Sequence, residues 1–219
     1  MSGENIIPKI ALNILLQITV NSLFLNHCMN KFLIIGLGNI GDEYRHTRHN
    51  IGFDVVSAFV LKQGGFFKTD RLAEVSEVKW KGKLFVCIKP TTFMNLSGKA
   101  FKYWIDKEKI ELSNTLTIVD ELALPLTKLR LRGAGSDAGH NGLKDIQLTL
   151  GTDQYPKLRF GIGNDFPKGK QVSFVLGKWS PAEIPIVHRK IEKCSEIIES
   201  FASIGLEKTM NMANTLSFE

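Results

Sequence analysis

His49 and Asp120 are the two side chains whose positions best suit acid–base chemistry. His49 lies in the polar segment Tyr44–Asn50, just before a run with helical spacing, where an imidazole can accept a proton near neutral pH. Asp120 ends the apolar run Thr117–Asp120, where a carboxylate can accept a hydrogen bond from a ring N–H and raise the basicity of that imidazole. The structural alternatives are a solvated loop histidine, which we expect for His46, and a helix cap or turn for Asp120.

Asn39, Asn95 and Asn141 each follow or precede a predicted element at a strand-to-helix junction. Because the carboxyl ends of strands in α/β proteins share one crevice, we expect these three side chains to line a common site. An amide offers a donor and an acceptor without charge, which suits it to hold an ester carbonyl, a water or a developing oxyanion. The alternative for each asparagine is a turn former or a helix cap.

The sequence carries no motif for a nucleophilic side chain or for a metal site. Ser136 does not lie in a G-x-S-x-G elbow, and Cys87 lies inside an apolar run that predicts a core strand. No H-E-x-x-H motif or comparable ligand spacing is present, so we expect no metal. A His–Asp pair with amide side chains and no nucleophile favours attack by an activated water.

Gly36–Gly41 follows the first predicted strand and fits G-x-G-x-x-G, the dinucleotide-binding fingerprint. That fingerprint needs a helix that starts within it. Here a polar loop continues through Arg45, the next helix is expected only near Asn50, and a hairpin follows. A nicotinamide-dependent oxidoreductase therefore rests on this motif alone, and a titration of cofactor fluorescence would test it.

The elements that must position these residues alternate between strand and helix patterns. Strands are predicted at 31–35, 73–80, 83–88, 116–119, 128–132, 158–162 and 172–176, and helices at 50–63, from Ser97, at 143–150 and at 181–204. The last helix has the clearest beginning, because Ser180, Pro181 and Glu183 form a capping box with proline at the first helical position. This order, without repeats or a linker, predicts a single α/β domain with a mixed, largely parallel sheet flanked by helices.

The composition is that of an ordinary globular protein. Its 219 residues are 43% hydrophobic and include 14 Phe and 3 Trp, which excludes disorder, while 19 Gly and 3 scattered Cys exclude collagen-like and disulfide-framework classes. The scattered cysteines suit a reducing compartment. The net charge of +6 mildly favours a polyanionic partner such as nucleic acid.

Residues 1–28 differ from the rest of the chain. The apolar stretch at 10–25 is interrupted by polar residues, so it suits a membrane span poorly, and the segment lacks the charged start and the A-x-A site of a signal peptide. We expect the catalytic domain to comprise residues 29–219 and Met29 to be the true start. A signal or anchor, or a genuine extension, are the alternatives for residues 1–28.

Six motifs together resemble those of the bacterial peptidyl-tRNA hydrolase family. They are GLGNIGDEYRHTRHNIG, KPTTFMNLSGKA, DELALP, AGHNGLKDI, LRFGIG and FVLGKWS, in the family's order, and they extend from about Phe32 to Asn214. The resemblance implies an enzyme that cleaves the ester between a peptide and the 3′ ribose of tRNA. It further implies a mixed-sheet α/β monomer in the cytoplasm that needs no cofactor and has peptidyl-tRNA, rather than a membrane, as its partner.

The resemblance also implies roles for individual residues. His49 takes the place of the family's catalytic base, and Asp120 takes the place of the partner that orients it. The positions that match substrate-binding residues of the family are Asn39, Tyr44, Met94, Asn95, His140 and Asn141, with Tyr44 on the site that lines the tRNA 3′ end. One departure concerns the loop at 133–139, which the family writes mostly with glycines and which here contains Asp137.

The run at 128–132 alternates cations with leucines. On a strand, Lys128, Arg130 and Arg132 would project from one face at a spacing of roughly 7 Å, which can follow successive phosphates. By resemblance we expect Arg132 and Arg159 to contact tRNA, with Lys168 and Lys170 nearby. The alternatives are a solvated sheet face or a non-catalytic RNA-binding module, which would bind tRNA without cleaving the ester.

Overall fold

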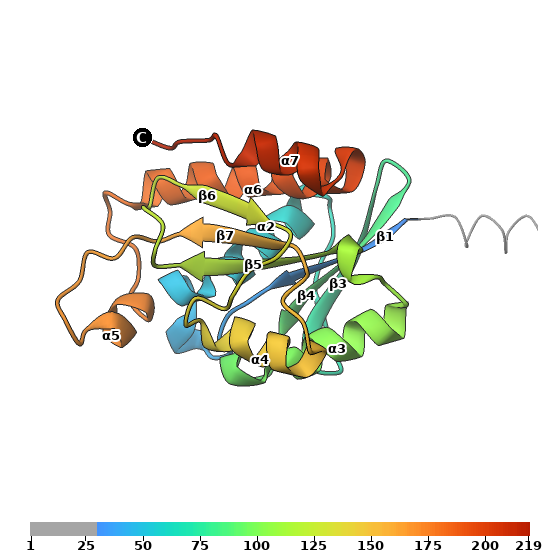
Figure 1. Ribbon diagram of the computed structural model, residues 1–219, viewed down its shortest axis with the longest axis horizontal. Coiled ribbons are helices and arrows are strands. Elements are labelled where there is room, and N and C mark those ends of the chain that lie inside the picture. The colour runs from blue at the N-terminus through green and yellow to red at the C-terminus, as the bar shows by residue number, and fades with distance from the viewer. Residues whose placement is uncertain (1–29) are drawn as a thin grey trace, which may run out of the picture. The chain divides into compact units, whose positions relative to one another are not determined.

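The computed structural model describes residues 30–219 (Figure 1). The predicted extension 1–28 and the choice of Met29 as its boundary lie outside the described residues. Within residues 30–219, none of the helices combines the length and the apolar character that crossing a membrane requires.

A seven-stranded mixed sheet forms the centre of the described chain, in the order β2-β3-β4-β1-β5-β7-β6. The strands are β1 (Lys31–Gly36), β2 (Lys68–Asp70), β3 (Ala73–Trp80), β4 (Lys83–Pro90), β5 (Thr115–Glu121), β6 (Leu129–Arg132) and β7 (Lys157–Gly161). The four neighbours β4, β1, β5 and β7 run parallel, whereas β2, β3 and β6 pair antiparallel at the two edges. The predicted fold class is therefore confirmed.

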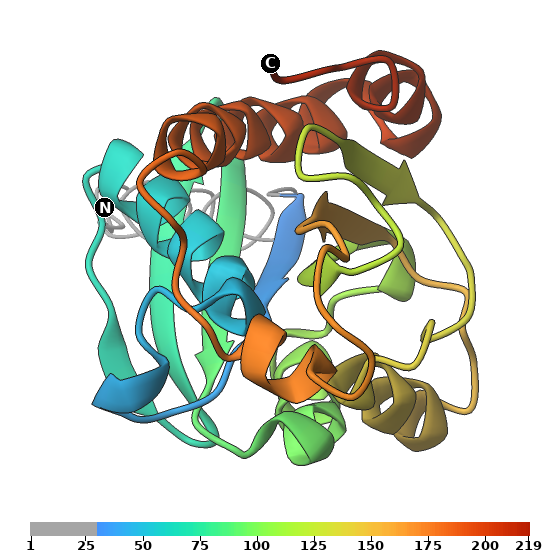
Figure 2. The ribbon, with the colours of Figure 1, turned by 90° about the vertical axis from the view of Figure 1, so that its left-hand side faces the viewer.

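Helices cover both faces of the sheet (Figure 1). One face carries α2 (Ile51–Lys62), α6 (Ile184–Ile204) and α7 (Leu206–Ala213), and the other carries α3 (Ser97–Glu108) and α4 (Asn141–Leu150). The short α5 (Gln171–Val175) lies at the carboxyl ends of the parallel strands, beside the beginning of α2, as Figure 2 shows. Four 3-10 turns complete the secondary structure of the described part: η1 (Asp42–Tyr44), η2 (Arg48–Asn50), η3 (Met94–Leu96) and η4 (Leu112–Asn114).

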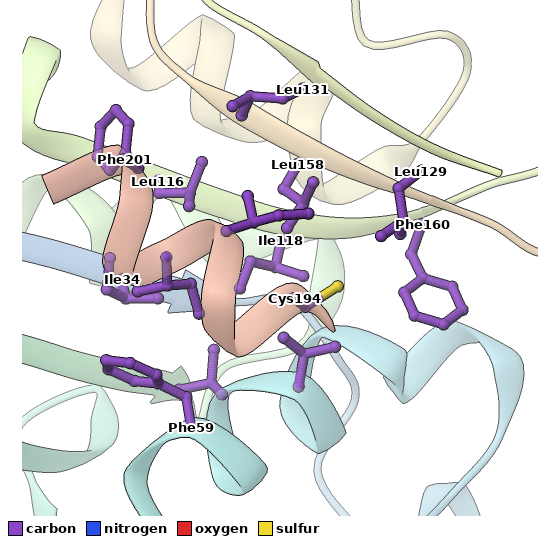
Figure 3. Close-up of a cluster of buried hydrophobic side chains, with 14 of the residues drawn as sticks. Ile34, Phe59, Leu116, Ile118, Leu129, Leu131, Leu158, Phe160, Cys194 and Phe201 are labelled. Carbon is purple, nitrogen blue, oxygen red and sulfur yellow. The ribbon is translucent and has the colours of Figure 1, made fainter. Parts of the chain in front are cut away.

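The apolar run of β1 explains why this strand is central. Phe32 and Ile34 point into the core shared with α2 and α6, while Leu33 and Ile35 point into the core shared with α3 and α4. Figure 3 shows the first of these cores, where Phe59 of α2 and other aromatic and aliphatic side chains fill the space between the sheet and its helices. Burial on both faces is typical of parallel strands, whose sequences are continuously apolar.

Two predictions about the last third of the chain are wrong. Residues 172–176 were predicted as a strand and form α5, because a short apolar run fits either a buried strand or a helical turn. The long helix begins at Ile184, three residues later than predicted. Its capping-box residues instead close a turn before the helix, in which the Ser180 N–H donates to the Glu183 carboxylate at 2.7 Å.

The first glycine of the 36–41 motif serves packing. A Cβ on Gly36 would lie 2.2 Å from the carbonyl oxygen of Gly52, so the first turn of α2 can approach the end of β1 only because both residues are glycine. The motif leads into η1 and η2, and α2 begins at Ile51. Since no helix of the described chain starts within the motif, the nicotinamide alternative loses its one support.

Candidate active site

Three side chains meet at the carboxyl ends of the central strands. His49 comes from η2, Asp120 from the end of β5, and His140 from the residue that precedes α4. The Nδ1 atom of His49 lies 3.0 and 3.1 Å from the two carboxylate oxygens of Asp120, and Nε2 of His140 lies 3.1 Å from Oδ1 of the same carboxylate. The structure thus brings the predicted pair together and adds His140 as a second partner of Asp120.

Hydrogen-bond partners determine which ring nitrogen carries the proton on each histidine. Nδ1 of His140 accepts hydrogen bonds from the backbone N–H groups of Gly142 and Leu143, at 3.1 and 3.3 Å, and so caps α4. His140 must therefore donate to Asp120 from Nε2. His49 donates to Asp120 from Nδ1, which leaves its Nε2 as a free acceptor.

The charges of this cluster favour a basic His49. Burial acts to lower the pKa of His49, but the hydrogen bond and the negative charge of Asp120 outweigh it and raise the pKa above its ordinary value of 6.5. Burial acts to raise the pKa of Asp120, but the two imidazoles outweigh it and hold that pKa well below its usual range. Asp120 is therefore a carboxylate at neutral pH, ready to stabilise a protonated His49.

The same three residues have the spacing of a metal site, because their donor atoms all lie within 4.8 Å of one another. A metal on Nε2 of His140 would need that nitrogen deprotonated, and a neutral imidazole would then carry its proton on Nδ1. Nδ1 faces two backbone N–H groups, so this protonation state is disfavoured. The donor set fits a hydrogen-bonded network better than a metal centre.

A cavity of about 590 Å³ opens next to His49. The six predicted substrate-binding residues all line it: Asn39, Tyr44, Met94, Asn95, His140 and Asn141. Its apolar wall comes from Leu122 and from Val172, Val175 and Leu176 in and beside α5. The wall escaped prediction because residues 172–176 were assigned to a strand.

The model of the peptidyl-tRNA hydrolase family matches residues 33–219. The chain belongs to this family. The peptidyl-tRNA hydrolases of Phocaeicola vulgatus and Parabacteroides distasonis are each 50% identical to it over 184 residues, which cover 84% of this chain and 98% of each relative. A crystal structure of peptidyl-tRNA hydrolase from Acinetobacter baumannii is similar with a TM-score of 0.81 at 30% identity, covering 86% of this chain and 96% of that one.

Asn50 fixes the backbone of Asn39, one of the residues that the family resemblance singled out. Its Oδ1 accepts a hydrogen bond from the backbone N–H of Asn39 at 2.8 Å, and its Nδ2 donates to the backbone carbonyl of Asn39 at 2.9 Å. Asn50 is only 3% exposed, so this two-point contact fixes the backbone of Asn39. The only sequence sign of this role was the position of Asn50 at the start of α2.

Arg48 is a second positioning residue that sequence reasoning missed. Its guanidinium donates to the carbonyl of Lys178 at 2.9 Å and to both carboxylate oxygens of Glu183 at 3.1 and 2.8 Å. The same group lies 4.4 Å from the ring centre of Phe174. Arg48 therefore ties the turn that carries His49 to the segment around α5, which forms the apolar wall of the cavity.

The basic strand predicted at 128–132 forms as β6, without Lys128. Arg130 and Arg132 are exposed on β6 and alternate with the buried Leu129 and Leu131. Lys128 precedes the strand and is half-buried, with its Nζ 3.4 Å from the carbonyl oxygen of Leu216. Two of the three predicted cations thus face solvent from one side of the sheet edge.

Arg159 lies beside Arg130 across the β6–β7 pair, but its guanidinium points into the protein. The side chain is only about 9% exposed, pairs with the Glu121 carboxylate and donates to the carbonyl of Ser136 at 2.5 Å. The guanidinium that was expected to contact a phosphate therefore binds Glu121 and Ser136 instead. The placement favours a role in holding the loop at 133–139.

The loop at 133–139, where the sequence departs from the family's glycines, is tied down at several points. Asp137 turns back on its own loop, and its Oδ1 accepts the backbone N–H of Gly139 at 2.7 Å. Gln147 of α4 donates to the carbonyl of Gly135 at 3.0 Å. Asp137 thus stabilises the turn that leads into His140.

Proposed function

We propose that this protein hydrolyses the ester between the peptide and the 3′ ribose of peptidyl-tRNA. The observation that carries the proposal is the hydrogen bond between His49 and Asp120. It leaves Nε2 of His49 free, and His49 lines a cavity together with three asparagine side chains. Membership of the peptidyl-tRNA hydrolase family supports the choice of substrate.

The reaction needs a water that loses a proton as it attacks. Nε2 of His49 takes this proton while the water oxygen bonds to the ester carbonyl carbon, and the carboxylate of Asp120 stabilises the imidazolium that forms. The tetrahedral intermediate then collapses, the bond from carbon to the ribose 3′ oxygen breaks, and His49 returns the proton to that oxygen. No covalent enzyme intermediate is required.

The three asparagine side chains are proposed to have different roles. Asn141 lies next to His140 at the start of α4 and is proposed to hold the attacking water or the developing oxyanion. Asn39 and Asn95 are proposed to seat the peptide and the ribose. Tyr44 and Met94 line the same cavity, and Tyr44 is proposed to contact the tRNA 3′ end.

Arg132 is proposed to contact a phosphate of the tRNA body, since it is exposed on the sheet edge. For Arg159 we propose a positioning role, because Glu121 and Ser136 hold its guanidinium. We further propose that the protein acts as a monomer in the cytoplasm. Buried, unpaired thiols at Cys87 and Cys194 are consistent with a reducing compartment.

The test is an assay of ester cleavage with N-acetyl-aminoacyl-tRNA, with free aminoacyl-tRNA as the control substrate. We expect cleavage of the acylated substrate and little cleavage of the control. Binding of tRNA without any cleavage would instead identify a non-catalytic RNA-binding module and would overturn the proposal.

A further inference from the structure

The strand that carries the exposed arginines, β6, lies at an edge of the sheet, and within residues 30–219 it pairs with β7 alone. The pairing is short and runs from Leu129 opposite Phe160 to Arg132 opposite Lys157. Backbone N–H and C=O groups on the open side of such a strand need other partners or water. A short edge strand also opens more easily than the centre of a sheet. The position of the arginines therefore depends on what holds this edge.

Asn214, the residue that follows α7, binds the open edge of β6 at two points. Its Oδ1 accepts the backbone N–H of Leu131 at 2.7 Å, and its Nδ2 donates to the backbone carbonyl of Leu131 at 3.2 Å. The amide thus takes the place of a neighbouring strand, with one acceptor and one donor on a single side chain. The backbone N–H of Asn214 donates in turn to the carbonyl of Met210 in the last turn of α7, at 3.0 Å. Leu131 is consequently tied to α7 through Asn214.

The segment that follows Asn214 binds the same part of the chain again. The backbone N–H of Phe218 donates to the carbonyl of Thr127, two residues before β6 begins, at 3.0 Å. The Phe218 side chain is buried in the core that also contains Leu129 and Leu131. Figures 1 and 2 both show α7 beside β6. The leucines of β6 are thus held by the core and its backbone is held from the open edge.

We propose that Asn214 is a positioning residue for tRNA binding, which acts by fixing the backbone between Arg130 and Arg132. Both arginines are exposed and lie on one face of β6, at a spacing of roughly 7 Å that can follow successive phosphates. A fixed backbone helps both contacts, because ordering a mobile segment during binding costs affinity. This inference rests on the proposed function and extends its tRNA-binding surface to an uncharged residue.

The experiment measures cleavage of two substrates by variants at position 214. One substrate is N-acetyl-aminoacyl-tRNA, and the other is the same N-acetyl-aminoacyl ester on adenosine, which lacks the tRNA body. Asn214→Ala removes both hydrogen bonds to Leu131, and Asn214→Leu removes them while keeping a side chain of similar size. Thr215→Ala is the matched control, because Thr215 is exposed and its hydroxyl donates to the carbonyl of Met212 rather than to β6.

We expect both Asn214 variants to raise KM for the tRNA substrate about two- to fivefold, the scale of an exposed charge contact, and to leave kcat nearly unchanged. The slope of log affinity against log salt should become shallower by up to about 0.7–0.9, the value for one phosphate contact. Cleavage of the adenosine ester should match that of the parent, which also shows that each variant is folded. Thr215→Ala should match the parent on both substrates.

A double-mutant cycle separates a positioning role from a direct contact. If Asn214 acts through the arginines, then Asn214→Ala should not raise KM further once Arg130 and Arg132 have both been replaced by Ala. Additive effects would overturn the proposal, because they would show that Asn214 contacts the tRNA itself or acts elsewhere.

Equal losses on the tRNA substrate and on the adenosine ester would also overturn the proposal, because Asn214 would then support the fold as a whole. An unchanged KM and an unchanged salt slope in both Asn214 variants would overturn it too. Failure of the parent protein to cleave either substrate would instead overturn the proposed function, so the two failures are distinguishable.

Discussion

The reaction centre and the basic strand differ in how their polar groups are satisfied. Around Asp120, which is 5% exposed, the carboxylate and both imidazoles are joined by hydrogen bonds of 3.0–3.1 Å. On β6, Arg130 and Arg132 project into solvent between buried leucines. A network whose groups are fixed by hydrogen bonds can stabilise a transition state, whereas exposed cations bind the ground state and the transition state equally. Changes in the first region should therefore act on kcat, and changes in the second on KM.

The largest effect is expected at His49. Removal of the general base in His49→Ala should lower kcat by about 10²–10⁴-fold and leave tRNA binding nearly intact. Steady-state kinetics with N-acetyl-aminoacyl-tRNA, together with a tRNA-binding titration, measure both quantities. Retained activity would show that another group takes the proton.

Asp120→Asn should cost less than His49→Ala, because the amide oxygen can still accept the Nδ1–H of His49, although the negative charge and one of the two acceptor oxygens are lost. That charge raises the pKa of His49, so the variant should have a lower pKa at this residue. Activity needs an unprotonated His49 and falls as the pH drops through its pKa. The acidic limb of the kcat/KM profile should consequently move to lower pH. An unmoved limb would show that Asp120 does not raise the pKa of the catalytic base.

Asn141→Ala should lower kcat by up to about 10²–10³-fold if the amide holds the water or the oxyanion. The matched variants Asn39→Ala and Asn95→Ala should show more of their effect in KM, because they seat the substrate. Wild-type kinetics in all three variants would show that these asparagines serve only as turn formers or helix caps.

The smallest effect is expected at the basic strand. Arg132→Ala should raise KM for peptidyl-tRNA, leave kcat nearly unchanged, and reduce the slope of log affinity against log salt by about 0.7–0.9. A minimal ester without the tRNA body should be cleaved equally by the variant and the parent. An unchanged slope of log affinity against log salt would show that Arg132 is solvated and does not contact a phosphate.

Arg159 sharpens the same contrast. Its removal frees Glu121 and the loop at 133–139, so Arg159→Ala should slow cleavage of the minimal ester as well. If Arg159→Ala affects only the tRNA substrate, then its guanidinium reaches a phosphate after all and the positioning role is wrong.

Much of this fold could be predicted from the sequence because its central strands are buried and rich in apolar residues. β1 and β4 are apolar on both faces, whereas β7 alternates Leu158 and Phe160 with the charged Lys157 and Arg159. The predicted ranges of β1, β4, β5 and β7 agree with the structure to within a few residues. The three-residue β2 could not be predicted, because its polar residues are held by pairing with β3. The same holds for α5, since a run of five residues has too few turns to reveal its period.

The candidate site divides in the same way. His49, Asp120 and the asparagines have side chains with chemistry of their own, so their types and positions were informative. Arg48 and Asn50 act through contacts with distant residues or with the backbone, and such contacts leave no local pattern. The direction of a side chain is equally invisible, which is why Arg159 was expected at the surface.

The measurement that tests the central claim most directly is an NMR titration of the His49 imidazole in the parent protein and in Asp120→Asn. The account predicts a pKa above 6.5 in the parent, equal to the pKa of the acidic limb of kcat/KM, and a lower value in the variant. A His49 pKa that is the same in both proteins, or that differs from the kinetic pKa, would contradict the assignment of His49 as a base polarised by Asp120.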